Sequence, residues 1–374
     1  MCGDAGRRGY AQLLDEFWAQ ARLAGVSLPV AEPVSAAAFC LARQKLRPSL
    51  LGALLDMVRE DFDRRHSELS RWRGRRIFAV DGTRRNLTRS AELFAHFGQP
   101  SGGHTPQALV STLFDVVAKV PVAMRIAPGA SSERVELLSL LPHLNAGDVL
   151  VLDRGYPSHE VLDQLLSAGI DFVIRVPKSH TFKAVDVFQQ SGGDDYRVVL
   201  DSSGTVHRTG RLVRITGGRK EPWIILTSLR RSEFSRTDIG RIYHMRWEVE
   251  ELFKLEKSDY FSLRQLHAKT VLGVEQELRA QALFTALARL VLAEAAAHHD
   301  ANFSESSQKS AILTLASNVV AMLLTEDPDM AAAILDSAFQ RVLRIRHRKR
   351  PGRSCPRRSF KPGPRWNSMG RIGA

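Results

Sequence analysis

Two short apolar segments constrain the fold most, because each leads into an aspartate that is followed closely by a glycine. The first runs from Ile77 to Val80 and is followed by Asp81, and the second runs from Val149 to Leu152 and is followed by Asp153. A continuous apolar run of this length, bounded by turn residues, is typical of a buried strand. The sequence therefore predicts two buried strands that each carry a carboxylate at the tip.

The segments around these two strands predict a mixed α/β core. Residues 106–117 and 121–129 are strand-like runs separated by a short turn, so they should join the first strand in an antiparallel meander. Helices are expected over residues 132–144 and 158–170, and a further strand over 171–177. This order of elements resembles the ribonuclease-H-like fold, an α/β fold in which the first and fourth strands lie side by side in a mixed sheet with flanking helices.

A later helix combines an apolar stripe with a polar one. Over "YHMRWEVEELFKLEK" the helical period brings Tyr243, Arg246, Glu250 and Lys257 to one side, and bulky apolar residues occupy the other. The pattern is typical of an amphipathic helix with a solvated polar face. It also suits a helix that brings a third carboxylate, flanked by a hydroxyl and two cations, to the two aspartates.

Three carboxylates converge if this helix packs across the strand ends. Asp81, Asp153 and Glu250 would then repel one another in a poorly solvated cleft, and divalent cations are the usual resolution. Two hard ions about 3.5–4 Å apart stabilise the entering and leaving oxygens of a phosphodiester displacement. Because no His or Cys cluster accompanies the carboxylates, oxygen ligation favours Mg²⁺ or Mn²⁺ over Zn²⁺.

The positive charge of the chain is concentrated at one end. The net charge is +13, and residues 341–374 hold 12 Lys and Arg with no Asp or Glu, which leaves +1 for the rest. Such an arm, rich in proline, is expected to be disordered until it binds a polyanion such as nucleic acid, although solvating and targeting tails share the pattern. A second basic patch, Arg64–Arg76, holds six Arg around Trp72 and suits either phosphate contacts or a solvated linker.

Cysteine usage and hydropathy exclude several classes of protein. Cys2, Cys40 and Cys355 are scattered and form no CxxC pair, so neither a disulfide framework nor a zinc site is indicated. The N-terminus lacks the apolar core of a secretion signal, and no uninterrupted apolar run reaches transmembrane length. We expect a protein of the bacterial cytoplasm that associates with the nucleoid.

At these same motifs the chain resembles a known family. Tyr243, Arg246, Glu250 and Lys257 reproduce the Y-x2-R-x3-E-x6-K signature of the insertion-sequence-four family of DDE transposases. "VDGT" and "LDRGYPS" resemble the first and second acidic motifs of that family, and the resemblance spans about residues 75–300. It implies a ribonuclease-H-like fold and an enzyme that cleaves at transposon ends and transfers the new 3′ end to target DNA.

The resemblance also implies roles for individual residues. Asp81, Asp153 and Glu250 would be catalytic and hold two Mg²⁺ or Mn²⁺ ions. Contacts to end DNA are implied for Tyr243, Arg246, Lys257, Trp223 and Arg154. Trp223 equally fits a core aromatic on a strand, and Arg154 equally fits a local salt bridge. Pairing of two transposon ends implies a homodimer on DNA, with no membrane partner.

Five segments are predicted along the chain. Residues 1–74 form a helical N-terminal segment with DNA contacts, and residues 75–177 form the first part of the ribonuclease-H-like core. Residues 178–232 form an antiparallel β insertion, and residues 233–340 hold the catalytic helix and the remaining helices. Residues 341–374 form the basic tail.

Two other functions stay open from the residues alone. One is a ribonuclease-H-like nuclease or resolvase without strand transfer, and the other is a non-catalytic DNA-binding derivative. The Tyr, Arg and Lys of the signature helix argue against the first, because hydrolysis alone does not need them. The presence of all three carboxylates argues against the second.

Overall fold

The computed structural model of the chain describes residues 9–23, 25–177, 182–201, 208–216, 221–257 and 266–345. In this part the α-helices are α1 (Tyr10–Leu23), α2 (Ala36–Arg43), α3 (Pro48–His66), α4 (Ala91–Phe97), α5 (Glu133–Leu138), α6 (His159–Ser167), α7 (Lys183–Gln190), α8 (Arg236–Met245), α9 (Trp247–Glu256), α10 (Val271–His298), α11 (Gln308–Leu324) and α12 (Pro328–Arg344). Short 3-10 helices are η1 (Ser67–Ser70), η2 (Leu141–His143) and η3 (Phe303–Glu305). The strands are β1 (Arg71–Trp72), β2 (Arg75–Asn86), β3 (Gln107–Asp115), β4 (Val120–Pro128), β5 (Val149–Leu152), β6 (Asp171–Arg175), β7 (Asp195–Asp201), β8 (Arg208–Ile215) and β9 (Trp223–Thr227).

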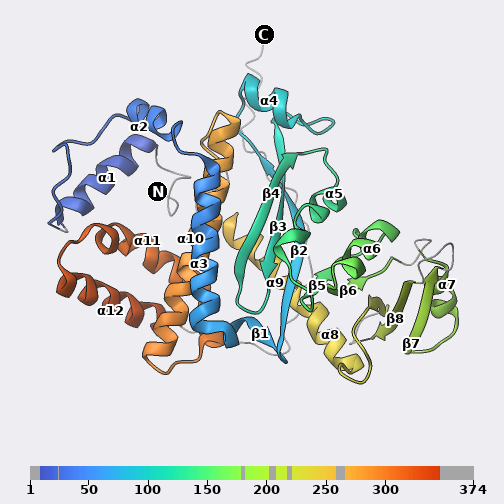
Figure 1. Cartoon of the computed structure of the whole chain (residues 1–374). Helices are drawn as coiled ribbons and strands as arrows, with labels where there is room; N and C mark the ends of the chain where they lie inside the picture. The colour runs from blue at the N-terminus through green and yellow to red at the C-terminus, as the bar shows by residue number, and fades with distance from the viewer. Residues whose placement is uncertain are drawn as a thin grey trace, which may run out of the picture.

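The strands of the described residues form one sheet in the order β4-β3-β2-β5-β6-β9-β8-β7, with β1 paired to β2 (Figure 1). β2, β3 and β4 form the expected antiparallel meander, whereas β5 is parallel to both β2 and β6. The first and fourth strands of the core therefore lie side by side. This is the ribonuclease-H-like arrangement, and the expected α/β fold class is confirmed.

The β-rich segment predicted over residues 178–232 is antiparallel, and it extends the central sheet through the pairing of β9 with β6. It also contains helix α7, which buries Val185 and Phe188 and which the sequence did not predict. One expectation about β2 was wrong. The strand continues past Asp81 to Asn86, because its second half still pairs with β3 after its pairing with β5 has ended.

Side-chain alternation divides the core into two layers on either side of the sheet. On β2, Phe78 and Val80 join the apolar cluster under α5, α6 and α7, whereas Ile77 and Ala79 join the cluster under α8 and α9. Because the alternation has a period of two, Asp81 leaves the strand on the side of α8 and α9. The sheet thus directs the first aspartate toward the later helices.

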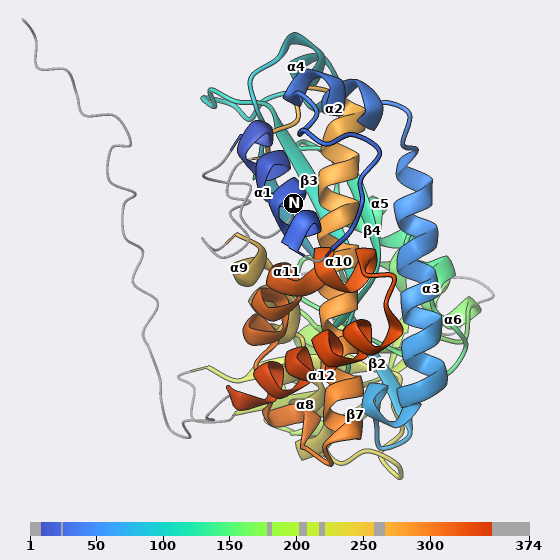
Figure 2. The ribbon, with the colours of Figure 1, turned by 90° about the vertical axis from the view of Figure 1, so that its left-hand side faces the viewer.

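A separate helical layer packs at the β3–β4 end of the sheet. α3 and α10 lie against each other and against β4, while α11, α12 and α1 stack on their outer side (Figures 1 and 2). α10 is long and apolar enough to span a membrane by length and composition, yet 56 % of its most apolar window is buried within the protein. Its Arg289 donates to the Ala118 carbonyl at 2.9 Å. The apolar composition therefore reflects a core helix.

The helices differ from the sequence expectations in number and in extent, since α4 and α7 were not predicted. The helices expected in the N-terminal segment, residues 1–74, are present as α1, α2 and α3. The single helix expected over residues 243–257 is divided into α8 and α9 at Arg246, whose N–H bonds to the carbonyl three residues earlier. α12 continues to Arg344, inside the segment expected as a disordered tail, and residues 346–374 lie outside the described residues.

The basic patch Arg64–Arg76 makes contacts within the protein. Five of its six arginines form ion pairs with described acidic residues: Arg64 and Arg65 with Asp61, Arg73 with Asp238, Arg75 with Asp171 and Glu233, and Arg76 with Asp63. Trp72 lies on β1 with the Arg73 guanidinium 5.3 Å from its ring centre. DNA contact by the N-terminal segment stays a prediction.

Candidate active site

Asp81 and Asp153 are brought together by the parallel pairing of β2 and β5. Ala79 lies opposite Val151, and each aspartate follows its residue of this pair by two positions. Side chains repeat every two residues along a strand, so the two carboxylates start from the same side of the sheet. Asp153 comes directly after the last residue of β5, where the apolar run predicts it.

Arg246 links Asp81 to Glu250. Its Nη1 donates to Asp81 Oδ2 at 3.2 Å, and its Nη2 donates to Glu250 Oε1. Arg246 is only 8 % exposed, so this bridge is largely shielded from water. α9 contacts β2 and carries Glu250 in its first turn, which brings the glutamate over the strand. One guanidinium thus contacts two carboxylates that are far apart in the sequence and offsets part of their charge.

Asp153 lies close enough to Asp81 to affect the pKa of the Asp81 carboxyl group. Burial raises the pKa of Asp81 to about 6 in spite of the Arg246 guanidinium, and the Asp153 carboxylate adds to the rise. Backbone amides hold both side chains: the Gly82 N–H donates to Asp81 Oδ1 at 2.9 Å, and the Gly155 N–H donates to Asp153 Oδ1 at 2.7 Å. The three predicted carboxylates and Arg246 form a cluster, in which Asp81 interacts with Asp153 directly and with Glu250 through Arg246.

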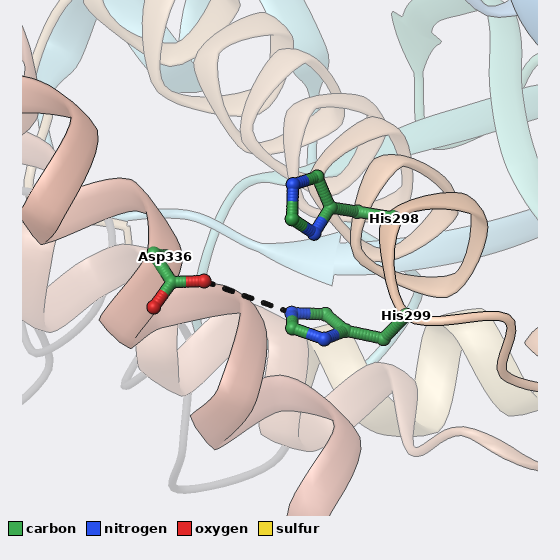
Figure 3. Close-up of side chains that lie close together, drawn as sticks. All are labelled: His298, His299 and Asp336. Atoms are coloured by element: carbon green, nitrogen blue, oxygen red, sulfur yellow. Dashed lines mark ion pairs between the residues drawn. The ribbon is translucent and has the colours of Figure 1, made fainter.

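The oxygens of the three predicted carboxylates do not all lie within 4.8 Å of one another. Among the described residues, the group of three potential metal-ligand atoms within 4.8 Å of one another is His298, His299 and Asp336. That group is exposed at the end of α10 and on α12, with 3.8 Å between His299 Nε2 and Asp336 Oδ1 (Figure 3). It contains none of the three predicted carboxylates, so no set of oxygens from Asp81, Asp153 and Glu250 meets this spacing.

The donor set fits a hard divalent cation. Asp81, Asp153 and Glu250 offer carboxylate oxygens alone, the ligands that Mg²⁺ and Mn²⁺ prefer. Burial and a like-charged neighbour destabilise ionised Asp81, and a bound cation relieves both effects. Whether these residues bind metal stays a prediction.

Tyr243 is buried, and the expectation that it lies on a solvated polar stripe is wrong. It is 4 % exposed, and its ring packs against the Trp223 ring with 5.2 Å between centroids. Burial raises its pKa, which Arg246 opposes. The helical period could not predict this burial, because the covering aromatic comes from β9.

Lys257 follows the last turn of α9 beside β2. Its Nζ donates to the Thr83 hydroxyl, two residues beyond Asp81 on the strand. Burial lowers the pKa of Lys257, and the Arg85 guanidinium lowers it further. The second cation of the signature is therefore held near the first carboxylate by a strand contact.

The two remaining predicted DNA contacts have different surroundings. Trp223 is partly buried in an aromatic cluster, and its ring centre lies 5.9 Å from that of Trp247. The Arg175 guanidinium lies 4.8 Å from the centre of the Trp223 ring. Arg154 is exposed and forms no ion pair with a described residue. DNA binding by either residue stays a prediction.

Sequence reasoning missed three features near the cluster. Glu133 begins α5 and its side chain lies against Gly82. Tyr156, of the quoted "DRGY" motif, is fully buried. Arg85 of β2 forms a buried ion pair with Glu256 of α9, at 2.7 Å. "DRGY" was a signal for Tyr156, whereas the other two depend on how α5 and α9 pack on β2 and leave no local pattern.

Comparison with known proteins places the chain in a protein family. A model of the transposase DDE domain family matches residues 72–287, more than half of the chain. No curated protein matches the chain. Among solved structures, piggyBac transposase in a synaptic complex with hairpin DNA is similar at 11 % identity and a TM-score of 0.41, over 74 % of this chain and 59 % of that one.

Two further structures show weaker likeness. Mos1 transposase in a paired-end complex has 14 % identity and a TM-score of 0.19, over 39 % of this chain and 45 % of that one. Endonuclease V of Ciona intestinalis with DNA has 13 % identity and a TM-score of 0.23, over 54 % and 97 %. The family match includes all three acidic residues and the whole signature helix, and by it this chain belongs to the transposase DDE domain family.

Proposed function

We propose that this DDE transposase acts on the ends of an element of the insertion-sequence-four family and moves it by a cut-and-paste reaction. The observation that carries the proposal is the cluster of Asp81, Asp153 and Glu250 around Arg246. Phosphodiester cleavage and transfer are the chemistry expected of such a cluster in a DDE transposase. The Y-x2-R-x3-E-x6-K spacing supports the narrower family.

In this proposal Asp81, Asp153 and Glu250 hold two Mg²⁺ or Mn²⁺ ions. When bound, the ions stabilise the charge on the entering and leaving oxygens of the phosphodiester exchange. Because the pKa of Asp81 is raised to about 6, this residue has to lose a proton at lower pH before it can bind a cation. Arg246 has to release its two carboxylates. Its freed guanidinium is then available to bind a DNA phosphate through charge-assisted hydrogen bonds.

The proposed partner is DNA, both as transposon ends and as target. Arg246, Lys257 and the exposed Arg154 supply positive charge near the carboxylates, and Trp223 with Tyr243 supplies aromatic surface. Two copies of the chain are proposed to pair the two ends as a homodimer. The proposed place of action is the bacterial cytoplasm, at the nucleoid.

A joining assay tests the reaction. The purified chain is incubated with Mg²⁺, a target plasmid and DNA duplexes that carry the inverted repeats flanking its reading frame, and joined molecules are expected. Asp153→Asn should bind the same duplexes and give neither cut nor joined product, because it removes one charge at nearly constant volume. Glu160→Gln removes the charge of an exposed residue on nearby α6 and should leave the products unchanged.

Other products would favour the other functions. Cut ends without joined molecules would favour a ribonuclease-H-like nuclease or resolvase. Binding without cutting by the unmodified chain, with Mg²⁺ or Mn²⁺, would favour a non-catalytic DNA-binding derivative. Equal loss of binding and cutting in Asp153→Asn would assign this residue a structural role and remove the main support for the proposal.

A further inference from the structure

A fourth carboxylate reaches the cluster from α5. Glu133 is the first residue of that helix, and α5 contacts β2. A Cβ atom placed on Gly82 would lie 2.8 Å from Glu133 Oε1 and 2.9 Å from its Cδ. The glutamate tip therefore fills the space that the missing side chain of Gly82 leaves, next to Asp81 in the chain. A larger residue at position 82 would push this carboxylate away.

Glu133 belongs to the same electrostatic cluster as the two aspartates. Burial raises the pKa of Glu133, and the Asp153 carboxylate raises it further, whereas Arg84 lowers it. Glu133 in turn contributes to the raised pKa of Asp81. Within the described residues, neither Glu133 nor Asp153 has an ion-pair partner within 4.0 Å, whereas Asp81 has Arg246. The Glu133 side of the cluster thus has no ion pair like that of Arg246, and Arg84 acts on Glu133 from beyond 4.0 Å.

The hydroxyl of Tyr156 lies near these acids without a partner. Tyr156 is 0 % exposed, and its hydroxyl oxygen is buried with no hydrogen-bond partner among the described residues. Burial raises its pKa well above the usual value, and the carboxylates of Asp81, Glu133 and Asp153 raise it further. Buried hydroxyls are nearly always hydrogen-bonded, so this donor requires an explanation. A rearrangement of the acids on binding a cation would supply its acceptor.

We infer that Glu133 is a fourth acidic ligand, which binds a divalent cation of the Mg²⁺ and Mn²⁺ class together with Asp81 and Asp153. In the bound site the Tyr156 hydroxyl donates to one of the ligand carboxylates and holds it in place, as groups behind a metal ligand commonly do. Arg246 stays paired with Asp81 and Glu250 in the metal-free protein, where its single positive charge offsets one of their two negative charges. The inference rests on the metal dependence in the proposed function.

Metal affinity, measured without reference to catalysis, tests this role. Mn²⁺ binding to the full chain is followed by isothermal titration, with and without end DNA. Glu133→Gln and Tyr156→Phe should each lower Mn²⁺ affinity by roughly 10–100-fold, the loss that even partners behind metal ligands cause. Glu136→Gln is the matched control, because it removes the same charge from the same helix at a residue whose carboxylate faces Arg125 at 3.6 Å.

A change of metal preference separates a ligand from a structural residue. Glu133→Cys should lose Mn²⁺ affinity and gain Cd²⁺ affinity, since a thiolate prefers the softer ion. Glu136→Cys sets the background for a single added thiol. A Glu133→Cys chain that binds Cd²⁺ no better than this control would overturn the ligand role.

The failure of this inference can be told apart from the failure of the proposed function. Unchanged Mn²⁺ affinity in Glu133→Gln, with loss in Asp153→Asn, would remove Glu133 from the site and leave the proposed function standing. Unchanged affinity in Tyr156→Phe alone would remove the tyrosine and keep the glutamate. No Mn²⁺ binding by the unmodified chain, with or without DNA, would contradict both.

Discussion

Arg246 donates to both Asp81 and Glu250 in the free protein, although its motif predicts a phosphate contact. The two roles are compatible if cations and DNA bind together. Cations would then offset the negative charge of the carboxylates in place of Arg246, and the guanidinium would bind a DNA phosphate. The arginine is therefore expected to couple metal binding to DNA binding.

Removing this guanidinium should change the salt dependence of DNA binding. For Arg246→Ala in the presence of Mg²⁺, we expect the slope of log affinity against log salt to flatten by about 0.9, the value for a single neutralised phosphate. The measurement is fluorescence anisotropy of a labelled end duplex over a salt series. Arg241→Ala, at an exposed position of α8, is the comparison. Equal slopes for Arg246→Ala and the unmodified chain would remove Arg246 from the interface.

The raised pKa of Asp81 predicts a pH-dependent stability. Because the folded pKa of about 6 lies above the unfolded value of 3.8, the folded state binds this proton more tightly, and the stabilisation is lost as pH rises through 6. Asp81→Asn cannot titrate. Between pH 5 and pH 8 it should therefore gain roughly 1.4 kcal/mol in free energy of unfolding relative to the unmodified chain.

Urea unfolding with EDTA at the two pH values measures this difference. EDTA removes cations that would otherwise bind ionised Asp81 and change its stability. A difference between the two proteins that stays constant from pH 5 to pH 8 would show that Asp81 titrates in the folded state as it does in the unfolded chain.

At the scale of elements, the strands that carry the aspartates and the pairing of the core strands could be predicted, whereas the contacts of the helices with the sheet could not. β5 is buried throughout and so leaves a continuous apolar run in the sequence. The antiparallel half of β2 leaves no such run, since residues 82–86 are glycine and polar residues, and Asp81 was therefore expected at a strand tip. Helix α7 and the junction at Arg246 were missed because both depend on packing against the sheet.

The ion pair of Arg85 and Glu256 holds α9, and with it Glu250, on β2. Both side chains are 6 % exposed, and burial raises the pKa of Glu256 against the effect of Arg85. Arg85→Met should lower the free energy of unfolding by about 3–5 kcal/mol, because it leaves a buried carboxylate unpaired. Adding Glu256→Met should recover most of that loss, since no buried charge remains.

Chemical denaturation of Arg85→Met, of Glu256→Met and of the double variant measures the coupling free energy between the two residues. Lys254→Met breaks the exposed pair with Glu251 on the same helix and should cost about 1 kcal/mol or less. A double variant as unstable as the sum of the singles would show that Arg85 and Glu256 contribute independently of each other.

Across the whole molecule, charge is divided between a nearly neutral body and a basic C-terminal segment. Residues 346–374 carry 10 of the 12 Lys and Arg counted from position 341. Many arginines of the body are already paired with acids, including five in the Arg64–Arg76 patch. The C-terminal segment therefore carries most of the net positive charge of the chain.

Truncation after Ile345 should weaken DNA binding without affecting the stability of the body. Affinity should fall alike for end duplexes and unrelated duplexes, and the salt slope should flatten by about 0.9 for each phosphate that the shortened chain no longer neutralises. Thermal unfolding should be unchanged. A second variant keeps the full length and has Gln in place of the 10 Lys and Arg of residues 346–374, which distinguishes the effect of charge from the effect of chain length. Unchanged salt slopes in both chains would place DNA binding entirely in the body.

The sequence by itself determined the buried strands that lead into Asp81 and Asp153, the position of Asp153 just after its strand, and the spacing of the signature residues. These are local properties, because burial and helical period leave patterns over a few neighbouring residues. The tertiary structure alone decided that Arg246 bridges Asp81 and Glu250, that Tyr243 is covered by β9, and that Glu133 reaches the cluster over Gly82. Such contacts join residues far apart in the chain, and their geometry depends on how helices and strands pack.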